Sequence, residues 1–178
     1  AAWLGGVAAF SFRLAAGWRF TVRLRAVSHP APAEWQQVLA RTAARMGGSG
    51  AVRLMVSSLA EVPVVIGWLK PVILVPVGSL TGLSPEHLTA LLAHELAHIR
   101  RHDYLAGLIQ KVAECLLFYH PAVWWVSRQI RMERELCCDD LAVAASGDAA
   151  TYALALAELE SQRLPRFSTS LAANGGPL

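Results

Sequence analysis

Residues 84–101 read SPEHLTALLAHELAHIRR, and this stretch decides how the rest of the chain is interpreted. Ser84 is a good helix-capping residue, and Pro85 suits the first turn because its missing N–H costs nothing there. Glu86 follows, where an acidic side chain is favoured by the helix dipole. We therefore predict a helix from Pro85 to about Arg101. Small apolar residues flank its centre, which indicates a buried helix whose polar residues need partners.

Two histidines in this helix, His94 and His98, are four positions apart, and Glu95 follows the first of them. Residues four apart share a helical face, so both imidazoles can reach one zinc ion. Zinc lowers the pKa of a bound water to about 7, and a nearby carboxylate can then take its proton and pass it to a leaving amine. The pattern predicts His94 and His98 as metal ligands and Glu95 as the catalytic base. A solvated or core His–Glu pair is the alternative.

A catalytic zinc ion also needs a third protein ligand and one open position. The compact-zincin pattern would place a histidine at position 104 and a glycine at 101, but these residues are Tyr104 and Arg101. The remaining candidates are acidic residues on later helices, namely Glu114, Glu133, Glu135, Asp139 and Asp140. We assign the first two of these to structural roles.

Glu135 and Asp139 are four residues apart and so share a helical face. We predict that Glu135 binds zinc while Asp139 accepts a hydrogen bond from a histidine ring nitrogen, which fixes the orientation of that ring. The alternative is a surface acid pair that serves the neighbouring Arg131 and Arg134 by ordinary charge pairing.

Four further residues could take part in such a site. His102 is four residues beyond His98, but it falls near the helix end, where a surface or dipole role is favoured. His120 could fold back toward the site and stabilise a developing oxyanion. Cys137 and Cys138 could bind zinc as thiolates, but burial as small apolar residues is the favoured interpretation.

Outside the central helix, the sequence predicts a mixture of helices and short strands. Apolar spacing and proline or glycine boundaries predict further helices at about 31–46, 104–119, 122–145 and 148–163. Alternation around Leu54 predicts a half-buried strand, and the β-branched runs at 61–66 and 72–77 predict a hairpin. Pro63 and Pro76 then belong at strand ends or at a sheet edge, which either holds an extended substrate or is simply capped. The fold class is α+β, with a small antiparallel sheet packed on a helical core.

The composition is enough for one domain, and it is more apolar than that of an ordinary soluble domain. The chain has 178 residues, of which 54% are hydrophobic and 16% are charged, and its mean hydropathy is +0.40. Such a composition favours contact with lipid or with neighbouring helices. We divide the chain into residues 1–25, the end of a membrane span with a basic cytoplasmic flank; 26–163, the metal-binding domain; and 164–178, a loop or linker.

The N-terminal assignment depends on charge. Residues 1–12 are uncharged, and four arginines follow before the first acid, Glu34. This bias is typical of the cytoplasmic side of a span, although a buried or interfacial helix with a basic end is the alternative. The net charge of +3 gives little support for binding nucleic acid. Three cysteines without paired spacing argue against a disulfide framework and favour a reducing compartment.

Several of these segments together resemble the BlaR/MecR-type membrane zinc metallopeptidases, a family that includes the β-lactam sensor-transducers of bacteria. The resemblance covers nearly the whole chain, and the segments that carry it are residues 62–65, 71–76, 83–86, 94–103, 120–121 and 134–140. The resemblance implies a gluzincin-like α+β domain on the cytoplasmic side of transmembrane helices. It also implies zinc bound by His94, His98 and Glu135, with Glu95 catalytic. These residues contain nothing like the sensor domain, so β-lactam sensing is not carried over.

The expected function is therefore a zinc endopeptidase that cleaves itself or a regulatory protein, such as a transcriptional repressor, in membrane signal transduction. One alternative is a non-catalytic signalling module that keeps zinc for structure, although such a site has no use for Glu95. Another is a membrane-protein quality-control or prenyl-protein peptidase with the same zinc geometry.

Overall fold

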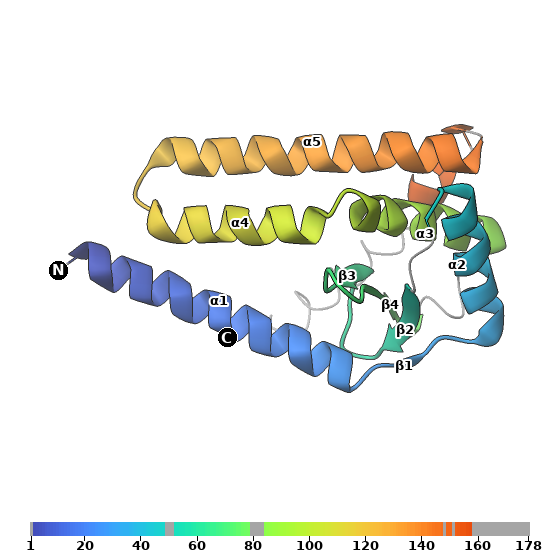
Figure 1. Cartoon of the computed structure of the whole chain (residues 1–178), viewed down its shortest axis with the longest axis horizontal. Helices are drawn as coiled ribbons and strands as arrows, with labels where there is room; N and C mark the ends of the chain where they lie inside the picture. Colours follow the sequence, from blue (N-terminus) through green and yellow to red (C-terminus); the bar gives the residue numbers. More distant parts are fainter. Residues whose placement is uncertain (1, 49–51, 79–83, 148, 151, 158–178) are drawn as a thin grey trace, which may run out of the picture.

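The computed structural model describes residues 2–48, 52–78, 84–147, 149–150 and 152–157, and it has the predicted α+β character. Figure 1 shows a small sheet, helix α3 between that sheet and α5, and a long α4–α5 hairpin that extends away from the sheet. The helices are α1 (Ala2–Ala26), α2 (Ala33–Arg45), α3 (Pro85–Arg100), α4 (Asp103–Leu116) and α5 (Pro121–Ser146). The strands are β1 (His29–Pro30), β2 (Arg53–Ser57), β3 (Val64–Ile66) and β4 (Val72–Pro76).

The helix predictions are confirmed to within a few residues. α3 begins as expected, because the Ser84 hydroxyl accepts a hydrogen bond from the backbone N–H of His87 at 3.2 Å. Of the helix predicted over 148–163, residues 149–150 and 152–157 are helical, and the remainder lies outside the described residues. The predicted loop at 164–178 lies outside them as well.

The sheet differs from the prediction in one respect, because it is mixed. Its strand order is β1-β2-β4-β3. β3 and β4 form the predicted antiparallel pair, with Val65 opposite Ile73, but β2 and β4 are parallel. The expectation of an antiparallel sheet is therefore wrong, because β3 crosses to the far edge and leaves β4 in the centre. All five residues of β4 are buried, as is usual for a central strand covered on both faces.

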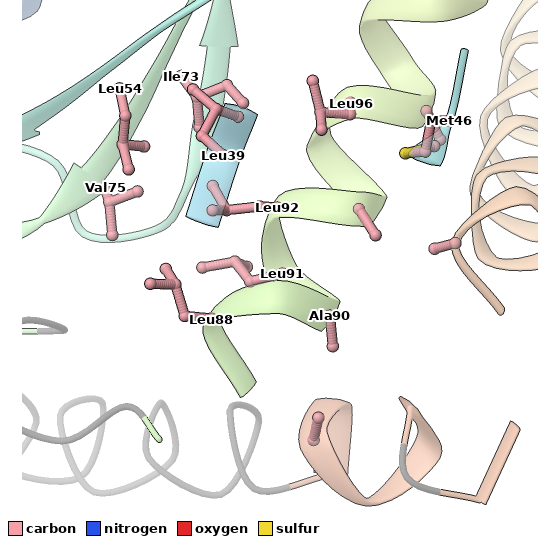
Figure 2. Close-up of a cluster of buried hydrophobic side chains, with 14 of the residues drawn as sticks. Leu39, Met46, Leu54, Ile73, Val75, Leu88, Ala90, Leu91, Leu92 and Leu96 are labelled. Carbon is pink, nitrogen blue, oxygen red and sulfur yellow. The ribbon is translucent and has the colours of Figure 1, made fainter. Parts of the chain in front are cut away.

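The core lies mainly between the sheet and α3. Alternate residues of the strands (Leu54, Ile73 and Val75) point toward α2 and α3, where they meet Leu39 and Leu92 (Figure 2). The other face of β4 packs with Leu24 near the end of α1. Since each fully buried side chain of this size contributes about 1.5–3 kcal/mol, this packing holds α3 firmly against the sheet. The metal-binding helix thus has a rigid support.

The N-terminal segment 1–25 lies almost entirely in the single helix α1. Within the part of the chain that the structure describes, no helix combines the length and the apolar character needed to cross a bilayer. The assignment of this segment to the end of a membrane span, and the domain boundaries drawn on it, stay predictions.

Candidate metal centre

Three side chains from two helices converge beside the C-terminal half of α3. The Nε2 atoms of His94 and His98 are 3.2 Å apart, with the imidazole rings nearly perpendicular. Oε2 of Glu135, which α5 carries, lies 3.4 Å from the first Nε2 and 3.7 Å from the second. The structure therefore brings together the three residues that the sequence predicted as ligands, in spite of the long separation of Glu135 from the histidines.

These distances suit a tetrahedral zinc ion. Zinc binds nitrogen and carboxylate oxygen at about 2.0–2.2 Å, so two ligand atoms on one tetrahedral ion lie about 3.3 Å apart. The three ligand-atom separations fall close to that value, and each residue offers one ligand atom to the group. Two imidazoles and one carboxylate also form the donor set of known catalytic zinc sites with an open fourth position. The residues present thus fit zinc, and His94, His98 and Glu135 are those that would hold it.

The His94 ring is oriented by residues far along the chain. Its Nδ1 lies 2.9 Å from Oδ1 of Asp139 and 3.1 Å from the hydroxyl of Tyr152. The Tyr152 hydroxyl in turn donates to the same Asp139 oxygen at 2.7 Å. Burial, followed by this hydrogen bond to Asp139, raises the pKa of Tyr152 well above its usual range, so the phenol stays protonated. A donor Nδ1–H leaves the Nε2 lone pair for a metal, which is the role predicted for Asp139.

The His98 ring is oriented by a carboxylate close to it in sequence. Its Nδ1 lies 2.8 Å from Oδ2 of the buried Asp103. The thiol of Cys138 lies 3.3 Å from the same oxygen, and Arg101 forms a longer ion pair with it at 3.6 Å. The turn that brings Asp103 back is made by His102, whose φ of 58° is in the left-handed region that few residue types adopt. The sequence interpretation did not identify Asp103 as a partner of His98.

Glu95 is buried and lines a cleft that also contains the three candidate ligands. The cleft has a volume of about 770 Å³, within the usual range for ligand sites. Its lining includes residues 62–65, which are the start of the edge strand β3 and the two residues before it. Residues of α3, the start of α4, and α5 also line the cleft. A carboxylate that shares a cleft with candidate metal ligands can act as a general base toward a metal-activated water.

The structure does not bring His120 to this site. His120 caps the start of α5, where its Nδ1 accepts a hydrogen bond from the N–H of Ala122. Glu135 lies further along the same helix, about 20 Å away at a rise of about 1.5 Å per residue. The chain does reverse direction between α4 and α5, but this turn lies at the end of the hairpin away from α3, so His120 stays far from the metal centre (Figure 1). The proposed oxyanion role is thus not supported.

The remaining candidates also have clear positions. Glu114 is buried and paired with Lys111 and Arg131, which confirms its structural assignment. Glu133 and Asp140 are exposed outside the cleft lining. His102 is exposed at the turn, but it also lines the cleft. Cys138 is fully buried, as expected, and no cysteine of the three is in a disulfide. Tyr152 could not be found from the sequence, since a lone tyrosine in a helical stretch carries no such signal.

Comparison with known families agrees with this geometry. The family model described as BlaR1 peptidase M56 matches residues 1–174. The chain belongs to this family. M56 is a peptidase family, and the His–Glu–x–x–His pattern on α3 and the cleft beside it lie within the matched residues.

Curated relatives of this M56 chain are regulatory proteins. The regulatory protein BlaR1 of Bacillus licheniformis is 30% identical over 83 residues, which are 47% of this chain and 14% of that protein. The methicillin resistance mecR1 protein of Staphylococcus aureus is 23% identical over 88 residues, which are 49% of this chain and 15% of that protein. The aligned part thus spans about one seventh of the length of each relative.

Proposed function

We propose that this chain is the zinc-dependent endopeptidase domain of a bacterial membrane protein that transduces a signal. It faces the cytoplasm and cleaves either itself or a regulatory protein such as a transcriptional repressor. The observation that carries the proposal is the convergence of His94, His98 and Glu135 with Glu95 beside them in one cleft. A zinc site with a purely structural role is closed by four protein ligands and has no use for an adjacent base.

The chain's own residues divide the chemistry among them. Zinc, when bound, lowers the pKa of a coordinated water and polarises the substrate carbonyl. Glu95 takes the proton of the attacking water and delivers it to the leaving amine nitrogen, as a carboxylate at such a site can. Asp139 and Asp103 accept hydrogen bonds from the Nδ1–H groups of the two histidines and so keep both Nε2 atoms directed at one point.

The substrate is an extended peptide that lies along β3. This strand is at the edge of the sheet and pairs with β4 alone among the described strands. Val64 and Val65 of this strand, with Val62 and Pro63 before it, line the cleft together with the histidines. An exposed edge can add a strand of peptide by backbone hydrogen bonds, which positions a scissile bond without demanding particular side chains.

Three observations support a cytoplasmic, membrane-attached signalling role: the arginines of α1, the free cysteines and the named relatives. Arginines are concentrated after residue 12 of α1, as on the cytoplasmic flank of a membrane span. The three cysteines are free, which suits a reducing compartment. The relatives named above are a regulatory protein and a methicillin resistance protein, which supports a role in signalling.

The test is metal analysis and proteolysis of the purified chain and of Glu95→Gln. We expect both proteins to retain zinc, and only the parent to cleave its own chain or a peptide library, as read by mass spectrometry. Glu133→Gln is the matched control, because Glu133 is exposed on α5 and outside the cleft. Equal cleavage by the parent and Glu95→Gln contradicts the mechanism. Zinc retention without cleavage in the parent would instead favour the non-catalytic signalling module.

A further inference from the structure

The α4–α5 hairpin has the reverse of the usual arrangement of polar and apolar side chains. Its buried residues include Gln110, Glu114 and Ser127, whereas Ile109 and Trp125 are each 64% exposed. A domain surrounded by water alone places such residues the other way round. The hairpin therefore presents to its surroundings a surface that is costly to hydrate.

The polar interior of the hairpin is fully used in holding the two helices together. Glu114 accepts from Lys111 at 2.7 Å and from Arg131 at 2.9 Å. Gln110 donates to the backbone carbonyl of Ser127 at 2.7 Å. Glu114 and Gln110 are therefore satisfied inside the hairpin and do not offset its apolar exterior.

The exposed apolar side chains surround α5 near its start instead of forming one stripe. Trp124, Trp125 and Val126 are consecutive, and all three are exposed. Consecutive residues of an α-helix point about 100° apart, so this turn is apolar around more than half of its circumference. A protein partner on one side would cover only part of such a surface, whereas lipid can surround it.

The start of α1 extends this apolar surface. Trp3 donates its indole N–H to the carbonyl of Leu116 at 3.1 Å, and the rings of Phe10 and Phe118 stack. Gly6 is required for this contact, since a Cβ there would overlap the Phe118 ring. We call residues 2–12 and 112–127 together the apolar end of the molecule.

Basic residues border the apolar end. It contains a single charged side chain, the buried and paired Glu114, and the charges that adjoin it along the chain are Arg13, Lys111 and Arg128. Lys111 and Arg128 lie about 8–10 Å from the hairpin turn, at a rise of about 1.5 Å per residue. A basic border with tryptophan and tyrosine beyond it complements the phosphates and interface of an anionic bilayer.

We propose that the apolar end inserts into one leaflet of an anionic lipid bilayer, with Arg13, Lys111 and Arg128 at the level of the phosphates. The depth beyond this border fits within one leaflet, because the whole hydrocarbon core is about 30 Å thick. This proposal names the surface for the membrane association in the proposed function, yet it does not depend on peptidase activity.

The test is co-flotation with vesicles of phosphatidylcholine and phosphatidylglycerol, and with vesicles of phosphatidylcholine alone. The full chain is used with Glu95→Gln throughout, so that self-cleavage cannot change the result. We expect the parent to float preferentially with the anionic vesicles. Trp125→Glu should bind them about tenfold or more weakly, because a large apolar side chain that enters the bilayer is replaced by a charged one. Leu59→Glu is the matched control, because Leu59 is also exposed but lies between β2 and β3. It should bind as the parent does.

Folding is checked by circular dichroism and zinc content, which Trp125→Glu should leave unchanged because its side chain is exposed and remote from the metal centre. Brominated lipids should quench parent tryptophan fluorescence more than that of Trp125→Phe. Equal vesicle binding by the parent and Trp125→Glu overturns the proposal. So does a parent that ignores vesicles but self-associates through a surface that Trp125→Glu disrupts, since the occupant would then be a second copy.

Discussion

The two histidines of the metal centre are oriented by similar groups, but these groups come from different distances along the chain. Each Nδ1 faces a carboxylate, and a second protic group, a phenol for His94 and a thiol for His98, faces that carboxylate. For His98 the carboxylate is Asp103, five residues further on and buried. For His94 it is Asp139 on α5, 45 residues away and partly exposed.

The His98 side of the site is therefore local in sequence, whereas the His94 side depends on assembly of the fold. The turn between α3 and α4 is enough to bring Asp103 to His98. The partners of His94 arrive only when α5 and residues 152–157 pack on α3, as does the third ligand, Glu135. Metal binding should therefore report on this packing, and the two halves should respond differently to substitution.

The largest effect is expected from Asp103→Ala. Its carboxylate is buried and faces His98, Cys138 and Arg101, so its loss leaves buried groups without their acceptor. We expect zinc affinity to fall by about 100-fold, the upper end for loss of a residue that orients a ligand. Competition against a fluorescent chelator measures this, with Asp140→Ala as the control because Asp140 is exposed beside the site. Unchanged affinity in Asp103→Ala would show that His98 needs no local support.

A smaller loss is expected from Asp139→Ala, about tenfold in zinc affinity. The Asp139 side chain is 38% exposed, so water can replace it as acceptor. Tyr152 also lies within 3.1 Å of His94 Nδ1 and can partly substitute. The same chelator competition ranks the two variants. If Asp139→Ala lost more zinc affinity than Asp103→Ala, the distant carboxylate at His94 would be the more important of the two.

A still smaller effect is expected from Tyr152→Phe, about threefold in zinc affinity, as for one neutral hydrogen bond. The double variant with Asp139→Ala should lose more than the product of the single losses, because each residue compensates for the other at His94. Tyr152 stays protonated because burial and Asp139 raise its pKa, so the effect should be the same at pH 6 and pH 9. Strictly multiplicative losses would mean that the two residues act separately.

The sequence predicted the parts of this site that repeat at helical spacing. His94 and His98, and likewise Glu135 and Asp139, are four residues apart, and the structure brings all four together. Asp103 escaped prediction because its approach depends on the left-handed backbone at His102. His120 was misplaced because the chain folds back at the far end of the α4–α5 hairpin, which leaves His120 at the start of α5 and Glu135 further along it. The parallel β2–β4 pair was missed because strand neighbours depend on where β3 crosses, which residue alternation does not encode.

The smallest effect concerns the thiol on the His98 side. Burial, then the hydrogen bond to Asp103 and its charge, raise the pKa of the Cys138 thiol to about 12, against 9.0 for an ordinary cysteine. At pH 8 the folded protein should therefore leave Cys138 unalkylated by iodoacetamide while the half-buried Cys137 reacts, as read by fragment-ion mass spectrometry. Because the folded pKa is the higher one, the stability of the parent relative to Cys138→Ala should decline as pH rises from about 9 toward about 12. Rapid alkylation of Cys138 at pH 8 would mean that the local half of the site opens readily, contrary to its burial and short contacts.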